Sequence, residues 1–199
     1  MGEPLADQVL QKIGEARELY HRLILMVGPA GSGKTSALQE VSASTSLSAC
    51  GHAQAGAPLV NVNLELSRRM LDLTERQRAL QLPRLLQDVC ASSAERQTSE
   101  VLLFDNIEIL FDVKLQQDPL RLLQGLSRNK TIVAAWPGNV SGLSTYAHEN
   151  DVRRTTHDPR RYLTYAVPDH PEYRRYPIRD LIIVNASSVE RHTWPGVWS

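Results

Sequence analysis

Residues 23–35 read Leu-Ile-Leu-Met-Val-Gly-Pro-Ala-Gly-Ser-Gly-Lys-Thr, and the expected fold class follows from this stretch. Its first part, Leu23–Val27, is a short continuous apolar run that ends in glycine. Such a run is typical of a strand buried on both faces of a parallel sheet. We expect a helix over residues 34–43, directly after the glycines. Strand, glycine-rich loop and helix in this order predict the start of an α/β domain.

Residues 28–35 match the pattern Gly, four residues, Gly-Lys-Ser/Thr of a phosphate-binding loop at every position. Glycines let the backbone turn tightly, so that successive N–H groups form an anion nest, to which the following helix adds its partial positive charge. Lys34 is predicted to reach the β- and γ-oxygens of ATP, and the Thr35 hydroxyl to ligate Mg²⁺. The alternative is an accidental glycine-rich turn, which an eight-position match disfavours. The predicted nucleotide-binding residues are Gly28, Pro29, Ala30, Gly31, Ser32, Gly33, Lys34, Thr35 and Ser36.

A second apolar run, Val101–Phe104, ends in a carboxylate, Asp105. In phosphate-loop enzymes such an aspartate lies at the carboxyl edge of the sheet and holds the water shell of the magnesium ion. Ligands of open α/β sheets bind at the same edge. We therefore predict a metal site formed by Thr35 and Asp105, the alternative being an ordinary turn aspartate after a core strand.

The residue that would activate water for hydrolysis is not fixed by the sequence. Many ATPases place a glutamate directly after the magnesium aspartate, but the next residue here is Asn106, whose amide cannot take a proton. Two candidates remain, Glu108 and Glu65, the second at the end of the predicted neighbouring strand. Slow or absent hydrolysis is the third alternative.

Arginines and one asparagine are candidates for contacts with the γ-phosphate. Arg128 precedes the predicted strand Thr131–Trp136, from where it would reach the nucleotide of a neighbouring subunit. The pair Arg174 and Arg175 is a second candidate for a charge-stabilising finger, and surface arginines are the alternative for all three. Asn139 is the polar residue nearest to the end of that strand.

The rest of the chain alternates strands with helices, which predicts one α/β domain with a mainly parallel sheet and flanking helices. We divide it into an N-terminal amphipathic helix within residues 1–21, a core at 22–185 and a tail at 186–199, with flexible loops at 44–57 and 137–160. The further strands expected are Leu59–Leu64, Thr131–Trp136, Tyr162–Val167 and Leu181–Val184, with a turn-prone segment at 168–177. The further helices expected are residues 4–20, residues 71–97 with a break or new first turn at Pro83, and a helix starting at Asp118-Pro119.

Composition limits the classes of partner. The 199 residues carry 22 basic and 22 acidic side chains, so no overall positive field attracts DNA or an anionic membrane. Cys50 and Cys90 lack metal-like spacing, and no apolar run is long enough to cross a bilayer. Residues 1–14 do not read as a signal peptide. We expect a cytoplasmic protein with reduced thiols.

Spacing narrows the class of phosphate-loop protein. Asn129-Lys130-Thr131-Ile132 lacks the aspartate of the guanine-binding motif, and the Leu-Ser-Gly-Gly-Gln segment of transporter ATPases is absent from the sequence. A strand and a long helix are predicted between Lys34 and Asp105, which suits ATPases with an additional central strand (ASCE/AAA-like order). No helical lid domain is expected after Trp136. The alternative is a small-molecule kinase whose phosphate-clamping lid contains Arg153, Arg154, Arg160 and Arg161.

Several stretches resemble the BrxF family, small phosphate-loop proteins of type III BREX bacteriophage-exclusion systems. The resemblance covers residues 5–184 approximately, whereas the segments 44–57 and 139–160 and the tail depart from it. The stretches that carry it are Tyr20-His21-Arg22-Leu23, Gly28–Thr35, residues 60–69, Asp105–Phe111, Asp118–Trp136 and Leu163–Tyr176.

The resemblance implies a bacterial ATPase component of antiviral defence. It would act beside a larger ATPase, a DNA methyltransferase and a phosphatase-like protein, with salt-sensitive contact to duplex DNA. Whether the chain self-associates stays open. We expect a Mg²⁺-dependent, slowly hydrolysing ATPase, with the small-molecule kinase and a non-hydrolysing, nucleotide-bound scaffold as alternatives.

Overall fold

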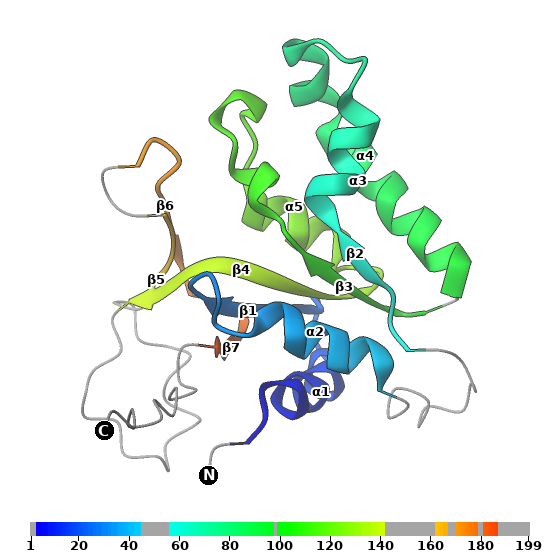
Figure 1. The fold of residues 1–199 in the computed structure, drawn as a ribbon, viewed down its shortest axis with the longest axis vertical. Helices are drawn as coiled ribbons and strands as arrows, with labels where there is room; N and C mark the ends of the chain where they lie inside the picture. The colour runs from blue at the N-terminus through cyan, green and yellow to red at the C-terminus, as the bar shows by residue number, and fades with distance from the viewer. Residues whose placement is uncertain are drawn as a thin grey trace, which may run out of the picture.

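The computed structural model describes residues 3–44, 56–97, 99–141, 162–166, 170–178 and 181–186. Five parallel strands form one sheet in the order β2–β3–β4–β1–β7 (Figure 1). The α/β fold with a mainly parallel sheet is therefore confirmed, and β4 lies between β1 and β3. The strands are β1 (Leu23–Gly28), β2 (Leu59–Asn61), β3 (Val101–Asp105), β4 (Thr131–Ser141) and β7 (Ile182–Asn185).

Helices cover both faces of the sheet, because successive strand residues point to opposite sides. Leu23 and Leu25 of β1 pack in a core with α3 (Val62–Met70), α4 (Glu75–Gln97) and α5 (Pro119–Leu126). Ile24 and Met26 face the other way, toward α1 (Leu5–Ala16) and α2 (Lys34–Ala43). Figure 1 shows these two helical layers on either side of the strands. The first strand is thus buried on both faces, as its apolar run predicts.

Two helices, α2 and α5, begin where the sequence predicts them. Residues 34–43 form α2, and Asp118 caps α5 by accepting a hydrogen bond from the Arg121 N–H, with Pro119 at the first helical position. The N-terminal helix is α1, shorter than expected, and its apolar face is buried against the sheet. Among the described residues, no helix is long and apolar enough to cross a membrane.

The expected strand Leu59–Leu64 is wrong in its second half. The strand ends at Asn61, and α3 begins at Val62. The Asn61 side chain accepts a hydrogen bond from the Leu64 N–H at 3.0 Å, so this asparagine is a helix N-cap. The alternation of apolar residues with asparagines therefore marks a strand end followed directly by a helix start.

The break expected at Pro83 is also wrong, since α4 runs through this proline. Proline has no N–H to donate to the carbonyl four residues earlier, which leaves the Ala79 carbonyl without its helical partner. The Gln117 side chain supplies the replacement, because its Nε2 donates to the Ala79 oxygen at 3.0 Å. The freed carbonyl is therefore satisfied by a residue 38 positions along the chain.

The strand β4 is longer than expected and carries an antiparallel extension. It continues to Ser141, so part of the predicted loop 137–160 is strand, and residues 142–160 lie outside the described part. Beyond Pro137 it pairs with β5 (Tyr162–Tyr165), which pairs in turn with β6 (Arg174–Pro177). The segment 168–177 was expected to be a turn, and its last four residues form β6 instead. We call β5 and β6, with the end of β4, the antiparallel extension.

A glycine without space for a side chain allows this extension to pair closely. A Cβ placed on Gly138 would lie 1.9 Å from the Thr164 carbonyl oxygen. We expect Gly138→Ala to lower the free energy of unfolding by about 1–3 kcal/mol, because the strands must separate to admit the methyl group. The matched control is Gly14→Ala in α1, where the Cβ meets nothing within 4 Å and helix propensity predicts a gain of about 1 kcal/mol. Equal effects of the two substitutions in urea unfolding would contradict this account.

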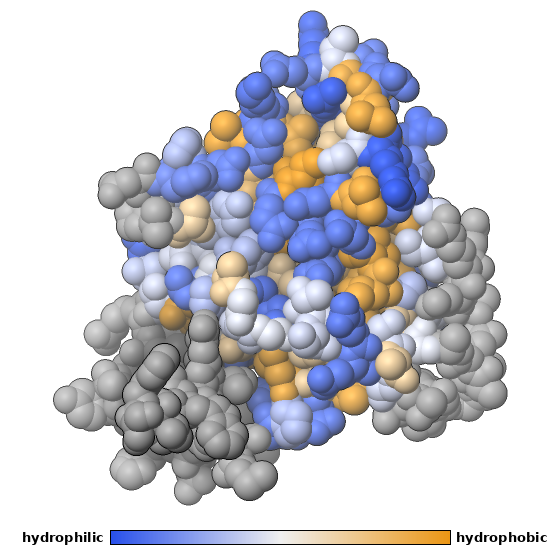
Figure 2. Space-filling view, in the orientation of Figure 1, coloured by the Kyte–Doolittle hydropathy of each residue, from blue (hydrophilic) through white to orange (hydrophobic). Residues whose placement is uncertain are grey.

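Most of the surface in view in Figure 2 is hydrophilic, with apolar side chains gathered in a few places. Figure 2 shows apolar patches among hydrophilic surface at the end formed by α3 and α4. The exposed large apolar side chains on or beside these helices are Leu64, Leu71 and Leu80.

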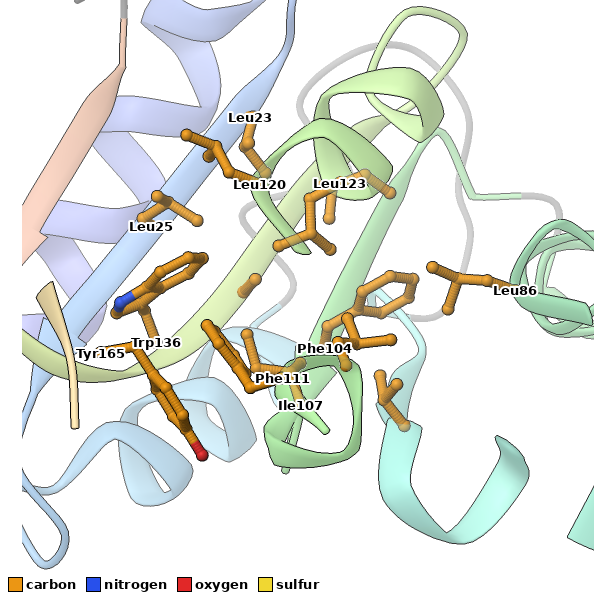
Figure 3. Close-up of a cluster of buried hydrophobic side chains, with 14 of the residues drawn as sticks. Leu23, Leu25, Leu86, Phe104, Ile107, Phe111, Leu120, Leu123, Trp136 and Tyr165 are labelled. Atoms are coloured by element: carbon orange, nitrogen blue, oxygen red, sulfur yellow. The ribbon is translucent and has the colours of Figure 1, made fainter. Parts of the chain in front are cut away.

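In the core, leucines from β1 and α5 meet an aromatic cluster (Figure 3). Cys90 is buried, and burial raises the pKa of its thiol to about 12. Cys50 lies outside the described residues.

Candidate functional site

The glycine-rich loop joins the carboxyl end of β1 to the start of α2, at the carboxyl edge of the parallel strands. Gly31 and Gly33 have φ angles of +74° and +87°, a backbone region that favours glycine. Gly28 is required for a different reason, because a Cβ there would lie 2.6 Å from Ser32 Oγ and 3.0 Å from Ala186 Cβ. The motif glycines are therefore explained by this loop's own geometry.

The loop presents backbone donors without acceptors. The first hydrogen bond of α2 runs from the Ala37 N–H to the Gly33 carbonyl at 3.0 Å. Within the described residues, the N–H groups from Gly33 to Ser36 have no acceptor, and the Ser32 N–H donates to the Pro29 carbonyl at 3.3 Å. Four free amides at a helix N-terminus, together with the helix dipole, form a site for an anion.

Lys34 is folded back over the loop. Its Nζ donates to the carbonyl oxygens of Gly28 and Pro29, at 2.6 and 2.7 Å, and to Ser32 Oγ at 3.2 Å. Burial lowers the pKa of the Lys34 ammonium, while the charges of Asp105 and Glu108 act in the opposite direction. A buried ammonium beside two carboxylates is the cation that the sequence predicts at this position.

A pocket of about 360 Å³ brings the predicted residues together. Lys34 and Thr35 line it from α2, Asp105 from the end of β3 and Glu108 from the segment that follows. The remaining lining residues are Ala30, Gly31, Gly33, Ser36, Asn106, Ala135 and Pro137. The structure therefore places the predicted lysine, hydroxyl and carboxylate around one cavity.

Asp105 is buried and its carboxylate is oriented by the backbone that follows it. The Asn106 N–H donates to Asp105 Oδ1 at 3.0 Å. Asn106 itself has a φ of +51°, a left-handed conformation that asparagine tolerates better than most residues. The chain thus turns sharply immediately after the carboxylate, and Asn106 and Glu108 still line the pocket.

The structure separates the two candidate bases. Glu108 begins the short 3-10 helix η2 (Glu108–Phe111) and lines the pocket. Glu65 lies in the first turn of α3, does not line the pocket, and pairs with Arg68 and Arg69. Of the two, Glu108 is the one that lines the pocket.

Asn63 is a site residue that the sequence did not single out. Its N–H donates to the Asn106 carbonyl at 2.9 Å, its Oδ1 accepts from the Ile109 N–H at 2.8 Å, and its Nδ2 donates to Glu108 Oε2 at 3.0 Å. The Ile109 N–H can only donate, so it fixes which end of the amide faces Glu108. The one sequence signal was the pair of alternate asparagines at 61 and 63.

The structure does not bring the predicted arginines to the pocket. Arg128 lies before the amino end of β4, at the opposite edge of the sheet, with its guanidinium 5.5 Å from the Tyr20 ring centre. Arg174 and Arg175 lie on β6, and the Arg175 guanidinium stacks over Tyr162 at 3.9 Å. Asn139 is exposed on β4 beyond the pocket. The role of Arg128 toward a neighbouring subunit's nucleotide stays a prediction, as do the finger role of Arg174 and Arg175 and the γ-phosphate contact of Asn139. The candidate lid arginines, Arg153, Arg154, Arg160 and Arg161, lie outside the described residues.

Comparison of the chain with protein-family models, with curated proteins and with solved structures finds no match. What this pocket can bind therefore follows from the chemistry of its lining residues.

Proposed function

We propose that this chain is a phosphate-loop ATPase of the type with an additional central strand, binding ATP together with Mg²⁺. The observation that carries the proposal is the meeting of Lys34, Thr35 and Asp105 around one pocket at the N-terminus of α2. A cation and unpaired backbone amides suit the β- and γ-phosphates, while a hydroxyl and a carboxylate suit a magnesium ion. The strand order β2–β3–β4–β1–β7 supports the class, since β4 separates the loop strand from the Asp105 strand.

The donor set fits magnesium better than a metal held by protein alone. Among the described residues, no three His, Cys, Asp or Glu side chains gather as a metal site. Magnesium is commonly held by one or two protein oxygens, waters and substrate phosphates. Thr35 and Asp105 would supply the protein oxygens here, and the bound ion would neutralise charge that develops on the phosphates.

The residues around the pocket suggest how this chain would hydrolyse ATP. Lys34 would leave the Gly28 and Pro29 carbonyls to bind the phosphates, and the amides from Gly33 to Ser36 would hold their oxygens. Glu108 would accept a proton from the attacking water, oriented by its hydrogen bond to Asn63. Because Glu108 is three residues beyond Asp105, we expect turnover to depend on how the segment between them is held.

A role in BREX defence beside a larger ATPase, a DNA methyltransferase and a phosphatase-like protein rests on the sequence resemblance. The small-molecule kinase alternative depends on arginines outside the described residues, so no observed contact favours it. Phosphate release without an added acceptor would argue against that alternative.

The proposal is tested by ATP binding with and without magnesium, in native protein and in Asp105→Ala. We expect tight binding of the native protein only with Mg²⁺, and a loss of about 10- to 100-fold in the variant, because Asp105 would hold the metal's water shell. Phosphate release would then be measured for the protein alone and with each proposed partner. Equal native affinity in Mg²⁺ and in chelator, unchanged by the substitution, would contradict the proposal.

A further inference from the structure

An aromatic stack connects the segment that carries Glu108 to the antiparallel extension. Glu108 begins η2, and the buried Phe111 ends it. The Phe111 ring stacks on Tyr165 of β5, with ring centres 3.6 Å apart and planes inclined by 14°. Figure 3 shows the two rings lying against each other. A 3-10 helix of four residues has few internal hydrogen bonds, so its position depends on contacts of this kind.

The stacked rings rest on Trp136, which belongs to the part of β4 that forms one wall of the pocket. Trp136 meets Phe111 edge-on, with ring centres 4.9 Å apart at 83°. It stands on β4 between Ala135 and Pro137, both of which line the pocket. The Trp136 Nε1–H donates to the Thr164 carbonyl at 3.0 Å, which ties the wall to the residue next to Tyr165. The wall, the extension and η2 therefore form one packed unit.

Tyr165 is also electrostatically linked to the site. Burial raises the pKa of its phenol to about 12, and the charges of Glu172 and Glu108 act in the same direction. The neutral hydroxyl donates to Glu172 Oε2 at 3.4 Å. Tyr165 does not line the pocket, so any influence on a ligand there passes through its neighbours.

We propose that Tyr165 is a positioning residue of the nucleotide site: its ring holds Phe111, and through η2 it keeps the Glu108 carboxylate at the pocket. This inference rests on the proposed ATPase function. It gives the antiparallel extension a part in turnover, although β5 and β6 contribute no residue to the cavity. Displacement of β5 is then a route by which ATP turnover is lowered without loss of ATP binding.

The experiment compares three variants of the full chain in single-turnover hydrolysis, with protein in excess over ATP. Tyr165→Met keeps a flexible apolar side chain in the core but removes the stacked ring, and we expect its rate constant to fall about tenfold through misplacement of the base. Its affinity for MgATP should equal that of the native protein, because the loop and Asp105 are untouched. Tyr165→Phe keeps the ring and loses only the bond to Glu172, so its rate should be near native.

Tyr176→Met controls for damage to the core. Tyr176 is buried in the same extension, and its ring contacts Trp136 at 5.4 Å. We expect lower thermal stability in this variant and a clearly smaller loss of rate than in Tyr165→Met, because the described ring contact of Tyr176 is with Trp136, whereas the Tyr165 ring stacks on Phe111 of η2. Equal loss of rate in Tyr165→Met and Tyr176→Met would show general damage and overturn the inference. If circular dichroism shows Tyr165→Met to be unfolded, Phe111→Leu breaks the same stack from η2 and is read in the same way.

A double-mutant cycle decides whether Tyr165 acts through Glu108. In a Glu108→Gln background, Tyr165→Met should not lower the single-turnover rate constant further, because the Glu108 carboxylate that Tyr165 positions is already replaced by an uncharged amide. Additive losses, or a native rate in folded Tyr165→Met, would overturn the inference and leave the ATPase proposal standing. A native chain that binds MgATP without hydrolysing it would overturn both the inference and the hydrolytic part of the proposed function, whereas a chain that binds no ATP would remove the proposed nucleotide site itself.

Discussion

Replacing Lys34 by alanine is expected to weaken the binding of MgATP by about 100-fold, because charge-assisted hydrogen bonds to phosphate contribute about 3 kcal/mol. The Lys34 ammonium is buried at the loop and already faces two carboxylates across the pocket. Isothermal titration with ATP and Mg²⁺ measures the change. Lys12→Ala is the matched control, since Lys12 is a half-exposed lysine of α1 paired with Glu15. It should bind ATP like the native protein.

The loop contacts of Lys34 add a second readout. Without nucleotide, its Nζ donates to two loop carbonyls and to the Ser32 hydroxyl, so the alanine variant also loses bonds that hold the loop. Thermal unfolding without ATP reports that structural loss, and the stabilisation added by ATP reports binding. We expect the ATP-dependent stabilisation to disappear in Lys34→Ala. If the variant unfolds at a lower temperature but ATP raises its unfolding temperature as much as in the native protein, Lys34 does not bind the nucleotide, and the proposed role is contradicted.

The parts of the fold that sequence predicts well are those determined by local chemistry. Leu23–Val27 is a short apolar run followed by glycine, which favours a doubly buried strand, and the glycines favour a loop. Asp118-Pro119 combines a cap with a residue suited to the first turn. Asp105 follows from the same reasoning, because a carboxylate after a buried parallel strand must lie at the ligand-binding edge. These inferences need no knowledge of distant residues.

The remaining features depend on contacts between distant segments. In the Pro83 helix Gln117 replaces the lost bond, and β6 forms because β5 lies beside it, although its sequence resembles a turn. Asn63 and Glu108 are 45 positions apart, and their hydrogen bond is invisible to periodicity. Composition and spacing therefore predict the lysine, the hydroxyl and the aspartate that line the pocket, whereas the presence of Glu108 there, and the absence of Glu65 from its lining, requires the tertiary structure.

Glu108→Gln is expected to lower the rate of ATP hydrolysis by about 10²- to 10⁴-fold, the usual contribution of a general base. Binding of MgATP should persist, because Lys34, Thr35 and Asp105 are retained. Glutamine keeps the size of the side chain and an acceptor for the Asn63 amide, so the change removes the proton acceptor and little else. Single-turnover phosphate release and equilibrium binding separate the two effects.

Glu65→Gln is the matched control, because the sequence predicts both glutamates equally as candidates for the general base. Its carboxylate pairs with Arg68 and Arg69 on α3, and each such pair on a helix contributes about 0.3–0.5 kcal/mol to stability. We therefore expect a slightly less stable protein with a native hydrolysis rate. If Glu65→Gln stops hydrolysis while Glu108→Gln does not, the general base is Glu65 and the assignment to Glu108 is wrong. If neither substitution changes the rate, water is activated without a side-chain base, and the hydrogen bond from Asn63 to Glu108 serves only to hold η2 against the sheet.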